Sequence, residues 1–178
     1  PQDVFQLSKK MQGAQRPVIM VGGGGWTGTD RSALQKCVNK VNIPVVTAFR
    51  YHDLFDNTDP LYLGEAGVGM TANTKRILQE ADVVLAVNLR FGEMTTDAFS
   101  LFGQERSGQW IAQTHRSGDE FHKYVSPDLA MICSPSAVLQ SLCDQLSHSN
   151  MQIDTTWVAA ARAGFETTQQ AKLQPSSV

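Results

Sequence analysis

Short runs of apolar residues alternate with amphipathic stretches along most of the chain. A short continuous apolar run is typical of a strand that is buried on both faces, as in a parallel sheet. Six such runs are the predicted strands: 18–21, 45–48, 61–63, 83–87, 110–113 and 129–132. Helices are predicted between them, where apolar residues recur every three or four positions. This alternation predicts βαβ crossovers, and therefore a parallel sheet with helices on both faces.

The predicted helices have recognisable starts as well as apolar faces. Either Thr29 or Asp30 can cap the helix that precedes the second strand. Ser134, which is followed by proline, is a typical start for the last helix of the core. The other predicted helices span 4–11, 71–81, 95–102 and 157–170. Together these elements predict a three-layer α/β/α, Rossmann-like sandwich with a five- to six-stranded parallel sheet.

The chain becomes polar after Ser147 and loses its strand pattern. We therefore expect residues 1–146 to form the domain, and residues 147–178 to form a C-terminal linker or helix extension that leads away from the core. The chain starts at Pro1 without a methionine, which favours a segment taken from a longer protein. Its first residues also lack the basic and then apolar pattern of a signal peptide.

Composition and charge exclude several classes of function. The formal net charge of the 178 residues is −2, so there is no basic excess with which to bind nucleic acid. No apolar run approaches the roughly 20 residues that a membrane span needs. Cys37, Cys133 and Cys143 do not have the spacing of zinc ligands. Their small, odd number favours buried thiols in a reducing compartment, and we expect a cytoplasmic protein.

Two glycine-rich loops follow predicted strands. Residues 23–28 read Gly-Gly-Gly-Trp-Thr-Gly, which fits the G-x-G-x-x-G pattern of dinucleotide sites. In such sites glycines let a pyrophosphate approach the backbone, and helix amides attract it. However, the strand at 45–48 does not end in the acidic residue that holds the ribose of NAD, and a tight turn explains the glycines equally well. The second loop, 64–70, also lies between a strand and a helix.

Both glycine loops are expected at the carboxyl edge of the sheet, where folds of this class bind ligands. Two further turns join them there, with Arg90 and His115. Arg90 fits either a phosphate contact or a surface ion pair. His52, His122 and His148 have no metal-ligand spacing, and no nucleophile motif is present. We therefore expect neither catalytic residues nor a metal site in this chain.

Several segments, taken in order, form a pattern of their own. They are Arg16-Pro17-Val18-Ile19 with the first glycine loop, Ile43-Pro44-Val45-Val46-Thr47, Pro60-Leu61-Tyr62-Leu63-Gly64, Gly67-Val68-Gly69, residues 80–87 with Arg90-Phe91, and Pro127-Asp128-Leu129-Ala130. Over residues 3–146 this set resembles the central domain of thiamine-diphosphate-dependent enzymes such as acetolactate (acetohydroxyacid) synthase and pyruvate oxidase. The resemblance implies a six-stranded parallel sheet that holds FAD in some members, and ADP or no ligand in others.

Together with the position of the loops, the resemblance predicts a pocket for FAD or ADP. The predicted cofactor-binding residues are Gly22, Gly23, Gly24, Gly25, Gly67, Gly69, Arg90, Phe91 and His115. The sequence departs from the flavin-binding members at three places. Where this chain has residues 92–94, those members carry acidic residues and an arginine. They carry an aspartate at about the position of His115, and Gly-Asp in place of Cys133-Ser134. The alternatives are therefore a working nucleotide site and a structural domain without a ligand.

In the family that the chain resembles, catalysis belongs to flanking pyrimidine- and diphosphate-binding domains, which hold thiamine diphosphate and Mg²⁺. The resemblance implies that this segment is not catalytic by itself and that those domains are its partners, in a homo-oligomeric enzyme that acts on 2-oxo acids. An alternative is a stand-alone nucleotide-binding or flavoprotein electron-transfer domain. An NAD-consuming deacylase on a similar sheet would need paired C-x-x-C zinc motifs, and the cysteine spacing excludes it.

Overall fold

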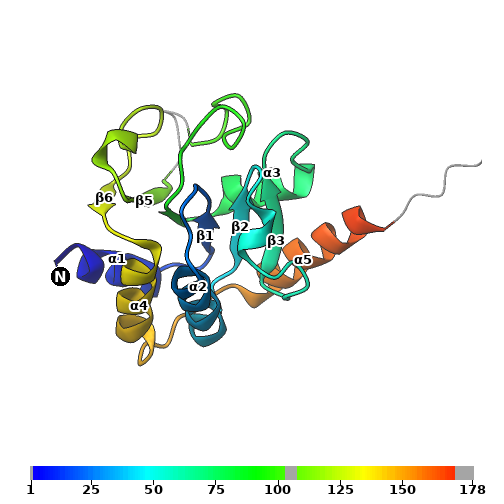
Figure 1. The fold of residues 1–178 in the computed structure, drawn as a ribbon. Coiled ribbons are helices and arrows are strands. Elements are labelled where there is room, and N and C mark those ends of the chain that lie inside the picture. Colours follow the sequence, from blue (N-terminus) through cyan, green and yellow to red (C-terminus); the bar gives the residue numbers. More distant parts are fainter. Residues whose placement is uncertain (1, 103–107, 171–178) are drawn as a thin grey trace, which may run out of the picture.

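The chain folds around one parallel sheet of six strands, in the order β3-β2-β1-β4-β5-β6 (Figure 1). The structure is a computed structural model and describes residues 2–102 and 108–170. The strands are β1 (Pro17–Val21), β2 (Val45–Ala48), β3 (Tyr62–Ala66), β4 (Val83–Val87), β5 (Trp110–His115) and β6 (Leu129–Ile132). Every neighbouring pair is parallel. The predicted α/β/α, Rossmann-like sandwich is confirmed, with six strands.

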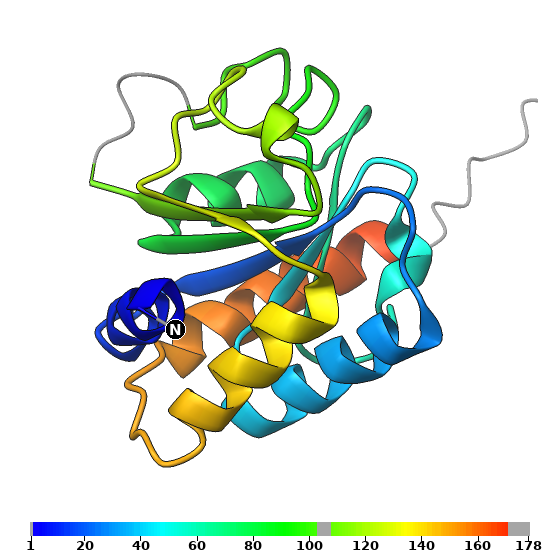
Figure 2. The ribbon, with the colours of Figure 1, turned by 60° about the vertical axis from the view of Figure 1, so that its left-hand side comes forward.

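The helices form the two outer layers. They are α1 (Gln2–Gln12), α2 (Gly28–Val41), α3 (Ala72–Glu80), α4 (Pro135–Leu146) and α5 (Thr155–Gln169), with short 3₁₀ turns η1 (His52–Leu54) and η2 (Gly118–Glu120). Helices α1, α2 and α4 cover one face of the sheet, and α3 and α5 cover the other (Figures 1 and 2). Across 2–102 and 108–170, no helix is long and apolar enough to cross a membrane.

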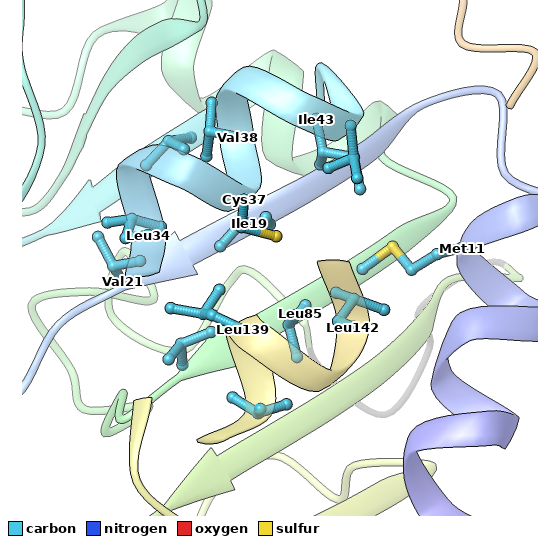
Figure 3. Packing of buried hydrophobic residues seen from close by; sticks show 14 of the residues in the cluster. Met11, Ile19, Val21, Leu34, Cys37, Val38, Ile43, Leu85, Leu139 and Leu142 are labelled. Carbon is cyan, nitrogen blue, oxygen red and sulfur yellow. The ribbon is translucent and has the colours of Figure 1, made fainter. Parts of the chain in front are cut away.

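The central strand explains why both faces need a helical layer. Side chains of a strand alternate between the two faces of the sheet, and all five residues of β1 are buried. Ile19 and Val21 face α2 and α4, as Figure 3 shows, while Val18 and Met20 face α3 and α5. Burial of one such side chain stabilises the fold by about 1.5–3 kcal/mol. A strand that is covered on both faces needs an apolar side chain at every position, and this explains the continuous apolar run in the sequence.

The start of α2 differs from the expectation that Thr29 or Asp30 caps it. The capping residue is Thr27, whose hydroxyl accepts a hydrogen bond from the Asp30 backbone N–H at 3.2 Å. The Asp30 carboxylate in turn accepts one from the Thr27 N–H at 3.0 Å. This reciprocal capping box places Thr29 and Asp30 inside the first turn. The expectation was wrong because three neighbouring polar residues all suit a cap, and only the backbone conformation selects one.

The segment after β4 is not the helix that was expected at 95–102. Asp97, Ala98 and Phe99 have φ angles of 51°, 53° and 64°, the left-handed region that L-residues rarely adopt in succession. On this segment, Asp97 Oδ2 lies 2.5 Å from Lys75 Nζ of α3. Phe102 is buried in the α3–α5 layer. The apolar residues whose spacing suggested a helix thus lie in a series of turns that fold over the sheet.

Helix α5 also differs from the expectation, which placed the segment after Ser147 away from the core. Trp157 and Ala161 are buried in the same layer as α3. The indole Nε1 of Trp157 donates a hydrogen bond to Glu80 Oε2 of α3 at 2.7 Å. The helix therefore packs on the domain. The linker role of residues 147–178 stays a prediction, and its last part, 171–178, lies outside the described residues.

Arg162 anchors α5 to the connection between β2 and β3. Its Nη1 atom donates hydrogen bonds to the backbone oxygens of Asn57, Asp59 and Tyr62, at 3.1, 2.8 and 3.0 Å. Only 15% of this side chain is exposed. A guanidinium group suits this position because it presents several donors in a fixed plane.

We expect Arg162→Ala to lower the free energy of unfolding by about 2–3 kcal/mol, because hydrogen bonds from a charged group are worth about 1.5–3 kcal/mol and the carbonyl groups lose their donor. Arg31→Ala is the matched control, since Arg31 pairs with Asp53 on the surface and such pairs contribute about 1 kcal/mol or less. Urea denaturation of both variants measures the difference. Equal, small losses would show that Arg162 does not anchor α5.

Candidate functional site

The loops that follow the strands meet at the carboxyl edge of the sheet. The strand order reverses between β1 and β4, which is the switch point where ligands bind in such sheets. Asn88, the first residue after β4, bridges this point. Its Nδ2 donates hydrogen bonds to Gly24 O at 2.9 Å and to Gly22 O at 3.3 Å. The first glycine loop and the turn that carries Arg90 are therefore held together by the protein itself.

Three of the four glycines in residues 22–25 are explained by the chain's own geometry. A Cβ atom on Gly22 would lie 2.7 Å from Ala48 Cβ. A Cβ atom on Gly23 would lie 2.1 Å from Asn88 O. Gly23 and Gly25 also have φ angles of 73° and 78°, which side chains rarely allow. These three glycines need no ligand to account for them.

Gly24 differs from its neighbours. A Cβ atom at this position would meet no atom within 4 Å, and its φ angle is not in the left-handed region. Neither packing nor backbone conformation therefore requires a glycine here. If a ligand lay against the loop, Gly24 is where an added methyl group would meet it, which makes this residue a direct probe of the loop's use.

A buried carboxylate lies at the start of two helices. Asp30 Oδ2 accepts hydrogen bonds from the backbone N–H and the hydroxyl of Thr27, at 3.0 and 2.9 Å. Asp30 Oδ1 accepts one at 2.9 Å from the backbone N–H of Ser136, in the first turn of α4. Only 2% of the Asp30 side chain is exposed. Helix N-termini attract anions, and Asp30 supplies one to α2 and to α4 at once.

The carboxylate of Asp30 is ionised at neutral pH. Burial by itself raises the pKa of Asp30, but hydrogen bonds from Thr27 and Ser136 outweigh it and lower the pKa to about 2. Arg116, which follows β5, balances the charge with Nη2 at 2.8 Å from Asp30 Oδ2. The same nitrogen lies 3.3 Å from Gly25 O, at the first glycine loop. Arg116 was not among the predicted site residues, although its place directly after a predicted strand was visible in the sequence.

The second glycine loop lies beside α3 and α5. A Cβ atom on Gly67 would lie 2.8 Å from the ring of Phe49, and Gly69 has a φ angle of 82°. Both glycines line a cavity of 370 Å³, together with residues such as Glu65 and Phe165. Among the residues that the structure describes, the first glycine loop does not contribute to this lining. The structure therefore places the two predicted loops in different surroundings.

The other predicted residues have three different environments. The Arg90 side chain is 64% exposed, with Nε 3.6 Å from Glu120 Oε2. Phe91 is buried in the layer between the sheet and α3. His115 Nδ1 lies 3.1 Å from the backbone N and O atoms of Ser117, within its own turn. Arg90 is thus open to a ligand, Phe91 is part of the core, and His115 is engaged locally.

Among the described residues, two buried side-chain oxygen atoms in β5 and in the turn that follows it accept no hydrogen bond. Gln113 is buried in β5 and its Nε2 donates to Leu89 O at 2.9 Å, while its Oε1 has no hydrogen-bond partner. The Oε2 atom of Glu120 is also buried and accepts no hydrogen bond in the described part of the chain. Buried acceptors of this kind favour an internal water molecule as the donor.

The edge does not fit a dinucleotide pyrophosphate in the manner of a G-x-G-x-x-G site. The capping box already engages the N–H groups of Thr27 and Asp30. Arg116 is paired with Asp30, and Arg90 lies beside Glu120. A pyrophosphate would therefore approach a neutralised edge and a buried negative charge. Within the described residues, no group of three or more His, Cys, Asp or Glu side chains is arranged to hold a metal ion.

The sequence of the chain matches a known protein family. The sequence pattern described as "Thiamine pyrophosphate enzyme, central domain" matches residues 5–142. The chain belongs to this family. The match runs from α1 into α4 and includes all six strands of the central domain, so the resemblance noted in the sequence is confirmed.

The relatives of this central domain are larger proteins. It is 26% identical over 148 residues to "Probable acetolactate synthase large subunit" of Methanococcus aeolicus, covering 83% of this chain and 24% of the relative. It is 26% identical over 148 residues to "Acetolactate synthase isozyme 3 large subunit" of Escherichia coli K12, covering 82% and 25%. It is 32% identical over 103 residues to "3D-(3,5/4)-trihydroxycyclohexane-1,2-dione hydrolase" of Clostridium botulinum, covering 57% and 16%. The chain spans about a quarter of the acetolactate synthases it matches.

The lowered pKa of Asp30 should make the stability of the central domain depend on pH. Because the folded pKa of about 2 lies below the ordinary value of 3.8, this stabilisation is present above about pH 4 and is lost as the pH falls toward 2. We expect Asp30→Asn to lower the free energy of unfolding at neutral pH by about 2 kcal/mol. The variant should also lose part of the pH dependence between 4 and 2.

Urea denaturation across this pH range measures both effects. Asp53→Asn is the control, because Asp53 forms an exposed pair with Arg31 and should contribute about 1 kcal/mol or less. A stability curve for Asp30→Asn that runs parallel to that of the unmodified chain would contradict the charged state assigned to Asp30.

Proposed function

We propose that this chain is the non-catalytic central domain of a larger thiamine-diphosphate-dependent enzyme that acts on 2-oxo acids, as an acetolactate synthase does. In this proposal, flanking pyrimidine- and diphosphate-binding domains hold thiamine diphosphate and Mg²⁺, and the central domain sets their spacing within a cytoplasmic homo-oligomer. Membership of the family supports the proposal. So does the size of its acetolactate synthase relatives, of which the chain spans about a quarter.

One observation carries the structural role of the domain: the carboxylate of Asp30 supplies the anion for α2 and α4. A dinucleotide site of the G-x-G-x-x-G type leaves its helix N-terminus open for a pyrophosphate. Here Thr27 and Ser136 donate to Asp30, and Arg116 neutralises it. Close packing or positive φ angles also explain Gly22, Gly23 and Gly25 without a ligand. The edge of the sheet is therefore proposed to be self-sufficient, and the domain to act as a spacer.

A second candidate function is the binding of a nucleotide, ADP or FAD, by the loops that follow β4 and β5. It is favoured by the exposed guanidinium of Arg90, which would suit a phosphate. In this candidate the first glycine loop plays no direct part. The two candidates therefore differ in whether any nucleotide binds, and through which residues.

Isothermal titration with FAD, ADP and NAD separates these functions. We expect no saturable heat with any of the three at concentrations up to about 1 mM. A dissociation constant of about 1 mM corresponds to a binding free energy of about −4 kcal/mol. The variants Gly24→Ala and Arg90→Ala are the controls for the two binding modes. Binding that is weakened by Gly24→Ala would restore the glycine loop as a cofactor site. Binding that is weakened by Arg90→Ala alone would favour the second candidate.

A separate experiment tests the non-catalytic role. The purified chain, supplied with thiamine diphosphate, Mg²⁺ and pyruvate, is expected to release no CO₂ above the level of the reaction without protein. The reason is that no catalytic constellation is found in the sequence and no metal-binding group in the described residues. Thiamine-dependent release of CO₂ by the chain alone would overturn the proposed division of labour.

A further inference from the structure

A groove separates the two helices that share Asp30. Helices α2 and α4 lie side by side on one face of the sheet (Figure 2). The groove between them has a volume of 1030 Å³, and its lining includes Cys37 of α2 and Cys143 of α4. Lys36, Lys40 and Asp144 lie along the same groove. Small molecules in solution can therefore reach the exposed part of Cys143 at this helix interface.

The two thiols are neighbours across that interface. Cys37 is fully buried, on the side of α2 that packs with Leu139 and Leu142 of α4 (Figure 3). Cys143 is half-buried and packs against the same cluster. Burial, and then the charge and hydrogen bond of the Cys143 thiol, raise the pKa of Cys37 to about 12. Both side chains line the same groove, one from each of the two facing helices.

The third thiol has different surroundings. Cys133 follows β6, and its Sγ atom lies 3.9 Å from Met131 O. It is not part of the lining of the groove. All three thiols are free, so Cys133 offers an internal comparison for the reactivity of the other two.

We propose that Cys37 and Cys143 form a peroxide-sensitive dithiol, which closes into a disulfide between α2 and α4. Cys143 is the thiol that reacts first, because it is half-exposed at the groove. Cys37 is the resolving thiol, because it is buried next to Cys143 and shielded from direct attack. This proposal is independent of the function proposed above, since neither thiol lies in the predicted cofactor site.

The reaction needs a peroxide as the oxidant and proceeds in two steps. In the first, the Cys143 sulfur attacks one oxygen of hydrogen peroxide, and the O–O bond breaks. The products are a sulfenic acid on Cys143 and hydroxide, which takes up the thiol proton as water. In the second step, the Cys37 sulfur attacks the Cys143 sulfur, an S–S bond forms, and the S–O bond breaks. Hydroxide leaves with the Cys37 proton, so two thiols and one peroxide yield one disulfide and two waters.

The disulfide would cross-link α2 and α4, whose N-termini already share the carboxylate of Asp30. Asp30 links Thr27 at the start of α2 to Ser136 at the start of α4. A bond between Cys37 and Cys143 would add a covalent link further along the same two helices. Because the link closes a long segment of chain, it should raise the resistance of the domain to unfolding.

Mass spectrometry of the full 178-residue chain tests the proposal. The chain is treated with hydrogen peroxide, alkylated, and digested with trypsin and chymotrypsin, so that Cys133 and Cys143 fall in separate peptides. We expect a linked Cys37–Cys143 peptide, loss of both alkylated products, an alkylated Cys133, and reversal of the link by dithiothreitol. Cys133→Ser should retain the link. Cys143→Ser should lose it and leave Cys37 open to alkylation only after unfolding.

Three results would overturn the proposal. One is peroxide treatment that leaves both Cys37 and Cys143 alkylatable in the unfolded chain. Another is conversion of Cys143 to a sulfinic acid without any linked peptide, which would show that Cys37 cannot reach it. The third is a disulfide that involves Cys133 or a second molecule. These results can be read on the unmodified chain, so the test holds even if Cys143→Ser folds poorly.

Discussion

Asp30 keeps a negative charge in the interior of this protein, and the positions of two helices depend on it. Parallel strands send their following helices back from one edge, so several helix N-termini with unpaired N–H groups gather there. The carboxylate meets that need for α2 through Thr27 and for α4 through Ser136. Arg116 then offsets the charge. Without the hydrogen bonds from both helices, burial would drive this carboxyl toward its neutral form.

The same interaction bears on function, because a carboxylate and a cofactor phosphate make similar demands. Each seeks N–H donors at a helix start and a nearby cation. In this central domain the chain's own carboxylate has both, and the glycine loop beside it is shaped by Asn88 and Ala48. The N–H groups of Thr27 and Ser136 are thus engaged by a carboxylate of the chain itself. A spacer role within a thiamine-dependent enzyme is consistent with this arrangement.

Most of the fold could be predicted from the sequence, because strands buried on both faces leave continuous apolar runs such as 83–87. The segment 95–102 could not, since its apolar spacing suits a helix while Asp97 to Phe99 adopt left-handed φ angles under tertiary contacts. The site was harder to predict. The glycine loops were visible, but Asp30 acts through partners 86 and 106 positions away, and such distant contacts leave no local pattern. The buried place of Phe91 was hidden for the same reason.

The Asp30 carboxylate is the anion that the chain itself supplies at the first glycine loop. Nuclear magnetic resonance tests it most directly, by following the backbone amide signals of residues 22–25 and of Thr29 while inorganic pyrophosphate is added. We expect only the small, non-saturating shifts that ionic strength causes at exposed amides. A saturable shift confined to Gly24, Gly25 and Thr29 would show that the loop still accepts an external phosphate, and would contradict the claim.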